Sequence, residues 1–346
     1  MADEQRPVRL VLEPEDEYNH RPDPVPNYNE SMYFNVVDHH SRLGAWFRLG
    51  NRVNEGYAEM SCCVYLPDGR VGFMYQRPRI STNEVFDAGG LSFEVEEPFE
   101  RLRVRYDGDL CLLDEPGRMA DPKRAFTENP LVPCTVDLAY RGIAPMFGGR
   151  TVDAETGEEP DRDAARSFSK AHYEQHVAAV GAVEVDSERF DVDGLGLRDK
   201  SWGPRYWQAI AWYRWLPMAF GEDFAMMISL ISADGVTAAG GGMVLHGDDY
   251  HLIRQVSVES DWDDDWYQTA LRATVSTDER TYEVTGDVVS LIPLRNRRTT
   301  PDGEDLLTRI TEGLTEYRCD GKVGWGLSEC LDQVVDGIPV GADVPI

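Results

Sequence analysis

The sequence predicts an all-β protein, and three observations lead to that expectation. Short runs of aromatic and β-branched residues recur along the 346-residue chain. Their spacing of about ten residues is typical of β-sandwiches and barrels. Asp-Gly and Gly-Asp pairs, which favour tight hairpin turns, separate several of these runs. Long stretches of helical periodicity are almost absent.

The first half of the chain begins with an irregular arm and continues as strands. Residues 1–30 are rich in proline and acidic side chains, so we expect no regular element there. Predicted strands follow in the ranges Gly44–Leu49, Tyr57–Leu66, Val71–Tyr75, 91–115 and 131–142. Hairpin turns are predicted at Pro67-Asp68-Gly69 and at Asp107-Gly108.

The second half is set off by a cluster of glycine, proline and acidic residues at 143–162, which predicts a linker. Residues 162–179 have the periodicity of a short helix. Strands then resume, with turns predicted at Asp234-Gly235, Gly247-Asp248 and Asp320-Gly321. These features predict three parts, which are an irregular arm (1–30), an N-terminal β domain (31–160) and a C-terminal β domain (161–346).

Charge and composition exclude several classes of function. Asp and Glu number 62 against 34 Lys and Arg, which gives a net charge of −28. Such a surface repels phosphate backbones and anionic membranes, so we expect no nucleic-acid partner. Apolar runs stay below the ~18 residues of a membrane span, and the charged N-terminus lacks a signal-peptide core. We therefore expect no membrane insertion and a cytoplasmic location.

The stretch from Leu195 to Leu216 concentrates charge and indole rings more than any other part of the chain. Aromatic walls with a few fixed charges are typical of a mostly apolar ligand pocket. Candidate substrate-binding residues are Trp202, Arg205, Tyr206, Trp207, Trp212 and, from the first half, Trp46. The alternative is structural, because tryptophans at this density also fill β cores and the charges also form buried ion networks.

Within this stretch, the string from Gly196 to Arg205, GLRDKSWGPR, resembles a known signature. It is similar to the RDHSWGPR motif of carotenoid 1,2-hydratase-like and AttH-like proteins. GAWFRLGNRVNEGYAEM and EGLTEYRCDGKVGWGLSE resemble uncharacterised bacterial members of the same group. The resemblance implies two lipocalin-like β-barrel domains packed together. It also implies cofactor-free addition of water to an isoprenoid double bond, with Trp202 at the motif tryptophan and Lys200 in place of its histidine.

Alkene hydration or isomerisation needs an acid and a base, and the sequence offers several candidates. Asp199 serves as an acid if burial raises its pKa. A desolvated Lys200 amine forms a Schiff base with a carbonyl, whereas a salt bridge to an acid is its structural alternative. Strand alternation turns one of His39 and His40 inward, where it would titrate near neutral pH.

A metal site has weaker support in the sequence. His172 and His176 are four residues apart on the predicted helix, but a third ligand is not evident. The six cysteines lack metal-ligand spacing, and we expect them to be reduced and buried. We therefore predict neither a metal nor a cofactor.

These observations favour a cofactor-independent lyase or isomerase acting on a small isoprenoid-like, steroid-like or aromatic molecule. Asp199, Lys200, His39 and His40 are its candidate catalytic residues. A lipocalin-type protein that binds such a ligand without reacting is one alternative, and Schiff-base chemistry at Lys200 is another. The expected partner is a small hydrophobic ligand, and a homodimer stays open.

Overall fold

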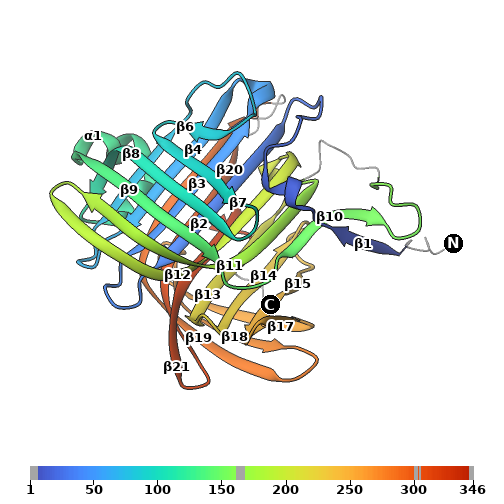
Figure 1. Cartoon of the computed structure of the whole chain (residues 1–346). Coiled ribbons are helices and arrows are strands. Elements are labelled where there is room, and N and C mark those ends of the chain that lie inside the picture. The colour runs from blue at the N-terminus through green and yellow to red at the C-terminus, as the bar shows by residue number, and fades with distance from the viewer. Residues whose placement is uncertain (1–6, 161–167, 300–302, 304, 343–346) are drawn as a thin grey trace.

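The all-β prediction is confirmed by the structure, a computed structural model that describes residues 7–160, 168–299, 303 and 305–342. Two large antiparallel sheets make up nearly all of these residues (Figure 1). Within them, α1 (Pro122–Glu128) is the one α-helix. No helix among the described residues is both long and apolar enough to cross a membrane.

The first sheet contains twelve strands, and eight of them close into a ring. Its strands are β1 (Val8–Val11), β2 (Tyr28–Val37), β3 (Gly44–Arg52), β4 (Tyr57–Tyr65), β5 (Val71–Gln76), β6 (Phe86–Ala88), β7 (Leu91–Glu97), β8 (Arg101–Leu113), β9 (Leu131–Gly142), β10 (Phe147–Asp153), β11 (Ala171–Val185) and β12 (Glu188–Pro204). The ring closes because β9 pairs with both β8 and β11. The resulting barrel runs β11-β12-β2-β3-β4-β5-β8-β9 and back to β11.

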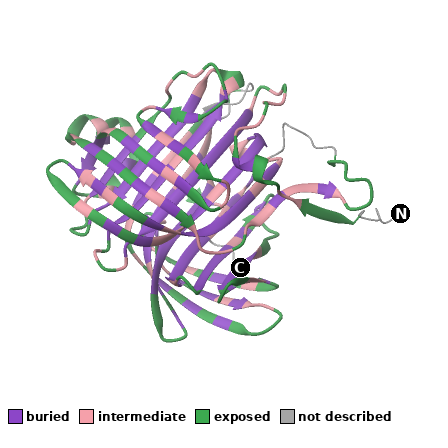
Figure 2. Cartoon of the chain, in the orientation of Figure 1, coloured by how far each residue is buried: buried purple, intermediate pink, exposed green. Residues whose placement is uncertain are grey.

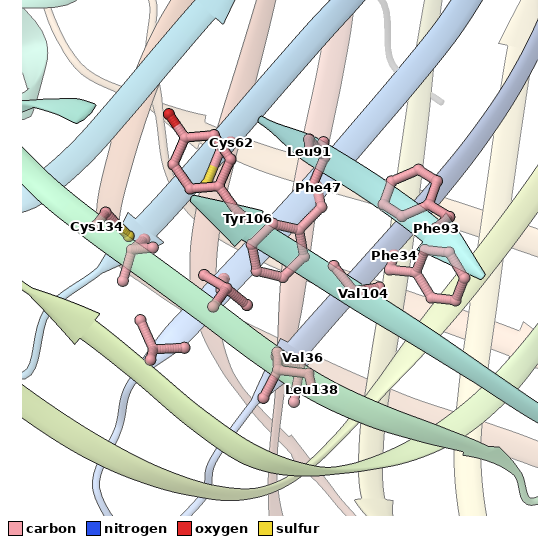
Figure 3. Packing of buried hydrophobic residues seen from close by; sticks show 14 of the residues in the cluster. Phe34, Val36, Phe47, Cys62, Leu91, Phe93, Val104, Tyr106, Cys134 and Leu138 are labelled. Carbon is pink, nitrogen blue, oxygen red and sulfur yellow. The ribbon is translucent and has the colours of Figure 1, made fainter. Parts of the chain in front are cut away.

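The interior of this barrel is filled by apolar side chains from alternate positions of its strands. Phe34, Phe47, Cys62, Val104 and Leu138 meet there (Figure 3). Because successive side chains of a strand point to opposite faces, each inward residue is flanked by outward ones. These buried side chains form an apolar core inside the barrel, and the cavity described below lies outside it.

The second sheet has ten strands and packs beside the barrel (Figure 1). Its strands are β13 (Trp212–Gly221), β14 (Phe224–Ser232), β15 (Ala239–His246), β16 (Asp249–Leu252), β17 (Gln255–Trp262), β18 (Gln268–Ser276), β19 (Thr281–Thr299), β20 (Asp305–Cys319), β21 (Lys322–Val335) and β22 (Ile338–Pro339). Its order is β16-β15-β14-β13-β21-β20-β19-β18-β17, with β22 paired to β21. Its concave face holds a second apolar core.

The two sheets share an interface that buries the outer face of part of the barrel. All ten residues of β2 are buried, because one face of the strand lines the barrel interior and the other meets the second sheet. In contrast, β9 alternates between buried and exposed residues because its outer face meets solvent (Figure 2). Trp46, Tyr65 and Leu314 are among the residues that join the two sheets.

Five details differ from the sequence-based expectations. Residues 1–30, which were expected to hold no regular element, contain β1, a 3₁₀ turn at Pro14–Glu17 and the start of β2. β8 runs straight through Asp107-Gly108, where a Cβ on Gly108 would lie 2.6 Å from the Tyr106 hydroxyl. That glycine therefore makes room for a neighbouring ring and forms no turn. The part of the predicted helix that the structure describes contains the start of β11, whereas residues 161–167 lie outside the described residues. The expected linker contains β10. The first sheet extends to Pro204, well beyond residue 160.

Candidate functional site

A cavity of about 670 Å³ lies between the two sheets. Its walls are side chains of β2–β5 and β10–β12, with Met119, Pro122 and Phe126, on one side, and of β13–β15 and β19–β21 on the other. The two sheets therefore share one chamber. This volume falls in the range of about 300–1,000 Å³ that is typical of small-molecule sites.

Much of the chamber wall is aromatic. Its aromatic residues are Tyr33, Trp46, Phe73, Tyr75, Phe126, Phe147, Phe168, Trp207, Tyr213 and Trp215. Several contact one another, as where the Tyr33 ring lies edge-on to Trp215 with 5.4 Å between centroids. Such walls suit an apolar ligand, and indole faces attract positive charge.

On the barrel side, His172, Glu174 and Asp199 form a cluster that faces the chamber. The hairpin of β11 and β12 places Glu174 directly opposite Asp199 and His172 opposite Ser201. The imidazole Nε2 of His172 lies 2.6 Å from Asp199 Oδ2 and 3.8 Å from Glu174 Oε1. Trp215, from the second sheet, donates its indole N–H to Glu174 over 2.6 Å.

Burial and mutual charge shift the pKa values of this cluster. Burial lowers the pKa of His172, but the charges of Asp199 and Glu174 outweigh that effect and raise the pKa to about 9. Burial also raises the pKa of Glu174 to about 7, although the charge of His172 opposes the shift. At neutral pH, His172 is therefore an imidazolium paired with Asp199, and Glu174 is close to half protonated.

On the opposite wall, Glu312 and Glu329 form a second acidic cluster. They face each other across the β20–β21 hairpin as register partners, and Tyr213 donates its hydroxyl hydrogen to Glu329. Burial raises the pKa of Glu329 to about 7, opposed by the Tyr213 hydrogen bond and aided by the charge of Asp199. Burial and the charge of Glu329 raise the pKa of Glu312 well above its ordinary value. The raised pKa values of both carboxyl groups favour a retained proton on this wall.

The His172, Glu174 and Asp199 cluster also has the donor set of a metal site. One ligand atom from each residue lies within 4.8 Å of the others. However, the 2.6 Å between His172 and Asp199 is a hydrogen-bond distance. Two ligands of a tetrahedral zinc ion, each at about 2.1 Å, would be about 3.4 Å apart. The present arrangement therefore suits a shared proton better than a metal ion.

Four of the residues predicted from the sequence line the chamber. They are Trp46, Asp199, Arg205 and Trp207. Trp46 projects from the outer face of β3, whereas Arg205 and Trp207 follow the end of β12. The structure thus brings together one predicted acid, one predicted cation and two of the predicted indoles.

Lys200 and Trp202 point away from the chamber, contrary to the expectation that the whole motif faces it. They lie on the opposite face of β12 from Asp199, because neighbouring residues of a strand alternate. Lys200 Nζ donates to Glu30 over 2.9 Å and to the carbonyls of Asp16 and Tyr18 over 2.7 Å each. The alternative expectation of a salt bridge at Lys200 is confirmed by this pair.

The motif thereby fastens the N-terminal segment to the barrel. Arg198 binds both carboxylate oxygens of Glu17 at 2.7 and 2.8 Å, and all of these atoms are buried. Trp202 stacks on the His20 ring with 4.1 Å between centroids. Burial lowers the pKa of Lys200, although Glu30 opposes the shift. Imine chemistry at Lys200 would require the amine to leave this pair.

The remaining predicted residues lie outside the chamber. Trp212 is buried in the core of the second sheet and donates to the Gly235 carbonyl over 3.2 Å. Tyr206 is half-buried beside η4 (Trp207–Ala209) and does not line the chamber. His39 and His40 lie in the turn that joins β2 to β3. The expected strand alternation therefore does not apply to them.

Sequence reasoning missed most of the titratable residues of the chamber. His172 was predicted on a helix, whereas strand β11 places it beside Glu174 on one face. Glu312 and Glu329 were not singled out. The predicted turn at Asp320-Gly321 carried the signal, because a two-residue turn there pairs residue 319 with 322 and hence 312 with 329.

Three solved structures share this fold at low sequence identity. An AttH-like protein from Nitrosomonas europaea has 15% identity and a TM-score of 0.59, with 93% of this chain and 96% of that chain covered. Kievitone hydratase from Nectria haematococca has 10% identity and a TM-score of 0.54, with 93% of each chain covered. CghA, crystallised with Sch210972, has 12% identity and a TM-score of 0.54, with 89% of each chain covered.

The resemblance to AttH-like and hydratase-like proteins is therefore confirmed for the fold. Comparison of the sequence with curated proteins finds no match. A family model described as a domain of unknown function, DUF7064, matches residues 13–334. That match covers every strand from β2 to β20, nearly all of β21, and the segment held by Lys200 and Arg198. The chain belongs to the DUF7064 family.

Proposed function

We propose that this protein is a cofactor-independent lyase or isomerase that transfers protons to and from a small hydrophobic compound bound in the chamber. The observation that carries the proposal is the pairing of two unlike clusters across one aromatic cavity. Glu312 and Glu329 hold a proton on one wall, and Asp199 is held as the partner of His172 on the other. Hydration, dehydration and double-bond isomerisation all need both an acid and a base within reach of the bound substrate.

The roles follow from the protonation states. Glu329, with a pKa of about 7, delivers its proton to a carbon of the double bond, so that a C–H bond forms and a carbocation remains. Asp199 then accepts a proton, either from a water molecule that adds to the cation or from a neighbouring carbon. The charge of Asp199 contributes to the raised pKa of Glu329, which indicates that the two carboxyl groups act within one site.

The aromatic wall suits the cationic intermediate of such a reaction. Indole faces attract a cation without forming a bond to it. Trp46, Trp207 and Trp215 all line the chamber. Two of the similar folds support the same class of ligand, because one is named a hydratase and another was crystallised with a small molecule.

The decisive experiment identifies the ligand and then tests its turnover. Apolar compounds that co-purify with the protein are identified by mass spectrometry and incubated with it in D₂O and in H₂¹⁸O. Deuterium in the product is expected for hydration and for double-bond isomerisation, ¹⁸O for hydration alone, and a mass lower by one water molecule for dehydration. Glu329→Gln should reduce the rate by about 10²-fold or more, whereas Glu100→Gln, at an exposed site on the barrel, should not. Recovery of the ligand unchanged and unlabelled would favour a carrier and refute the proposal.

A further inference from the structure

One part of the chamber presents a buried guanidinium, that of Arg205, which has no ion-pair partner among the described residues. Arg205 follows directly after β12, and only 8% of its surface is exposed. Its Nη2 donates to Ser201 Oγ over 2.6 Å. Its Nε has no acceptor among the described residues. A buried charge without a counter-ion is costly, so this arrangement indicates a missing partner.

The charges close to Arg205 are already engaged with other groups. Arg48 donates to Glu59 over 3.3 Å, and Asp199 is held by His172 at 2.6 Å. The guanidinium of Arg205 also lies over the rings of Phe168 and Trp207. Within the described part of the chain, no ion pair therefore cancels the positive charge of Arg205.

Aromatic rings fix how this guanidinium is presented. Its carbon lies 4.0 Å from the centroid of the Phe168 ring and 5.4 Å from that of Trp207. Arg48 lies against the same Trp207 ring at 5.7 Å. Rings that cover guanidinium faces leave the N–H groups in its plane as the available donors. A planar carboxylate matches such donors better than any neutral group does.

The overall charge of the chamber points the same way. The wall includes five arginines, namely Arg48, Arg77, Arg205, Arg295 and Arg297, and five acids. Three of those acids are Glu174, Glu312 and Glu329, whose pKa values are raised mainly by burial. The chamber thus carries a positive bias inside a protein whose acidic residues outnumber its basic ones by 62 to 34. Such a bias draws in anions.

We propose that the ligand of the chamber is a hydrophobic carboxylate, whose carboxylate group binds the free donors of Arg205 while its apolar body lies against Trp46 and Trp215. This inference rests on the proposed function in one respect, which is that the ligand binds in the chamber between the two sheets. It adds the chemical class of the substrate, which the acid–base clusters alone do not specify.

The test compares 2-naphthoate with its neutral counterpart 2-naphthamide, which have the same ring and similar shape. Dissociation constants are measured at pH 7 by calorimetry on the full-length chain. We expect wild type to bind the acid about ten-fold more tightly than the amide, or better, as for a charge-assisted hydrogen bond. Arg205→Met should bring this ratio close to one and leave amide binding within about two-fold. Arg254→Met is the matched control, because Arg254 is exposed, pairs with Asp278 and does not line the chamber. This variant should keep the wild-type ratio of affinities.

The wild-type ratio alone decides the inference if Arg205→Met fails to fold. Equal affinities for acid and amide, or an acid preference that survives Arg205→Met, would overturn it while leaving the proposed reaction untouched. Failure of both probes to bind would overturn it together with the assignment of the chamber as a ligand site. An acid preference in a protein without turnover would support it and refute only the proposed reaction.

Discussion

Replacing Glu329 by glutamine should remove a measurable part of the pH dependence of stability. Burial raises the pKa of Glu329 from 4.5 to about 7 in the folded chain, so the folded state holds this proton more tightly than the unfolded state. The stability that this group contributes is complete below its ordinary pKa and is lost as pH rises through the folded value. One pKa unit corresponds to about 1.4 kcal/mol, so between about pH 5.5 and pH 8.5 the loss is about 2 kcal/mol.

Urea denaturation followed by tryptophan fluorescence at the two pH values measures this loss. Wild type should lose free energy of unfolding toward alkaline pH, and Glu329→Gln should lose about 2 kcal/mol less. Glutamine has nearly the same shape as glutamate, and its amide oxygen can still accept the hydrogen bond from the Tyr213 hydroxyl. Glu100→Gln, at an exposed position, should behave as wild type. Identical pH dependence in wild type and Glu329→Gln would show that this carboxyl is ionised at neutral pH and cannot serve as the acid.

Three further changes test the rest of the site. Asp199→Asn should lower the pKa of His172 from about 9, because the charge and the hydrogen bond of Asp199 are both lost, and an unchanged value in an NMR titration of the ring would contradict this. Lys200→Met should destabilise the fold by about 3–5 kcal/mol by leaving Glu30 buried without its cation, yet the folded fraction should bind ligand normally in calorimetry. Trp215→Phe should raise the pKa of Glu174 further by removing its indole hydrogen bond, seen as an alkaline shift in the carboxyl infrared titration.

Strand positions and most turns could be predicted because they depend on local sequence. Asp234-Gly235, Gly247-Asp248 and Asp320-Gly321 all lie in turns between paired strands. The helix predicted over 162–179 was wrong for its described part, residues 168–179, because a spacing of four residues fits both a helix and a strand. His172, Glu174 and His176 lie at alternate positions, which equally indicates one face of a strand. Pairing with the neighbouring strands β9 and β12 makes this segment a strand and not a helix.

The candidate site was predictable only in part, because alternate residues of β12 face opposite sides and only one side meets the chamber. Asp199 was expected to face a chamber together with Lys200 and Trp202. Neighbouring residues of a strand point to opposite sides, so Asp199 and Lys200 could not share one. What the sequence did not reveal was which side holds the chamber, because that depends on how the second sheet packs against the barrel. The partners of Lys200 come from residues 16–30, far away in the chain.

The second acidic cluster shows how far hairpin register can carry a prediction about chemistry. Once Asp320-Gly321 is taken as a two-residue turn, Glu312 and Glu329 must lie opposite each other, because the residue numbers of each pair have a constant sum. Two carboxylates in that position repel unless solvent or a cation intervenes. Burial against the barrel removes the solvent, and the interaction between the pair then favours a retained proton. A cross-strand pair of acids on a face that packs against another sheet therefore indicates a neutral acid, which is the chemical property that the proposed reaction requires.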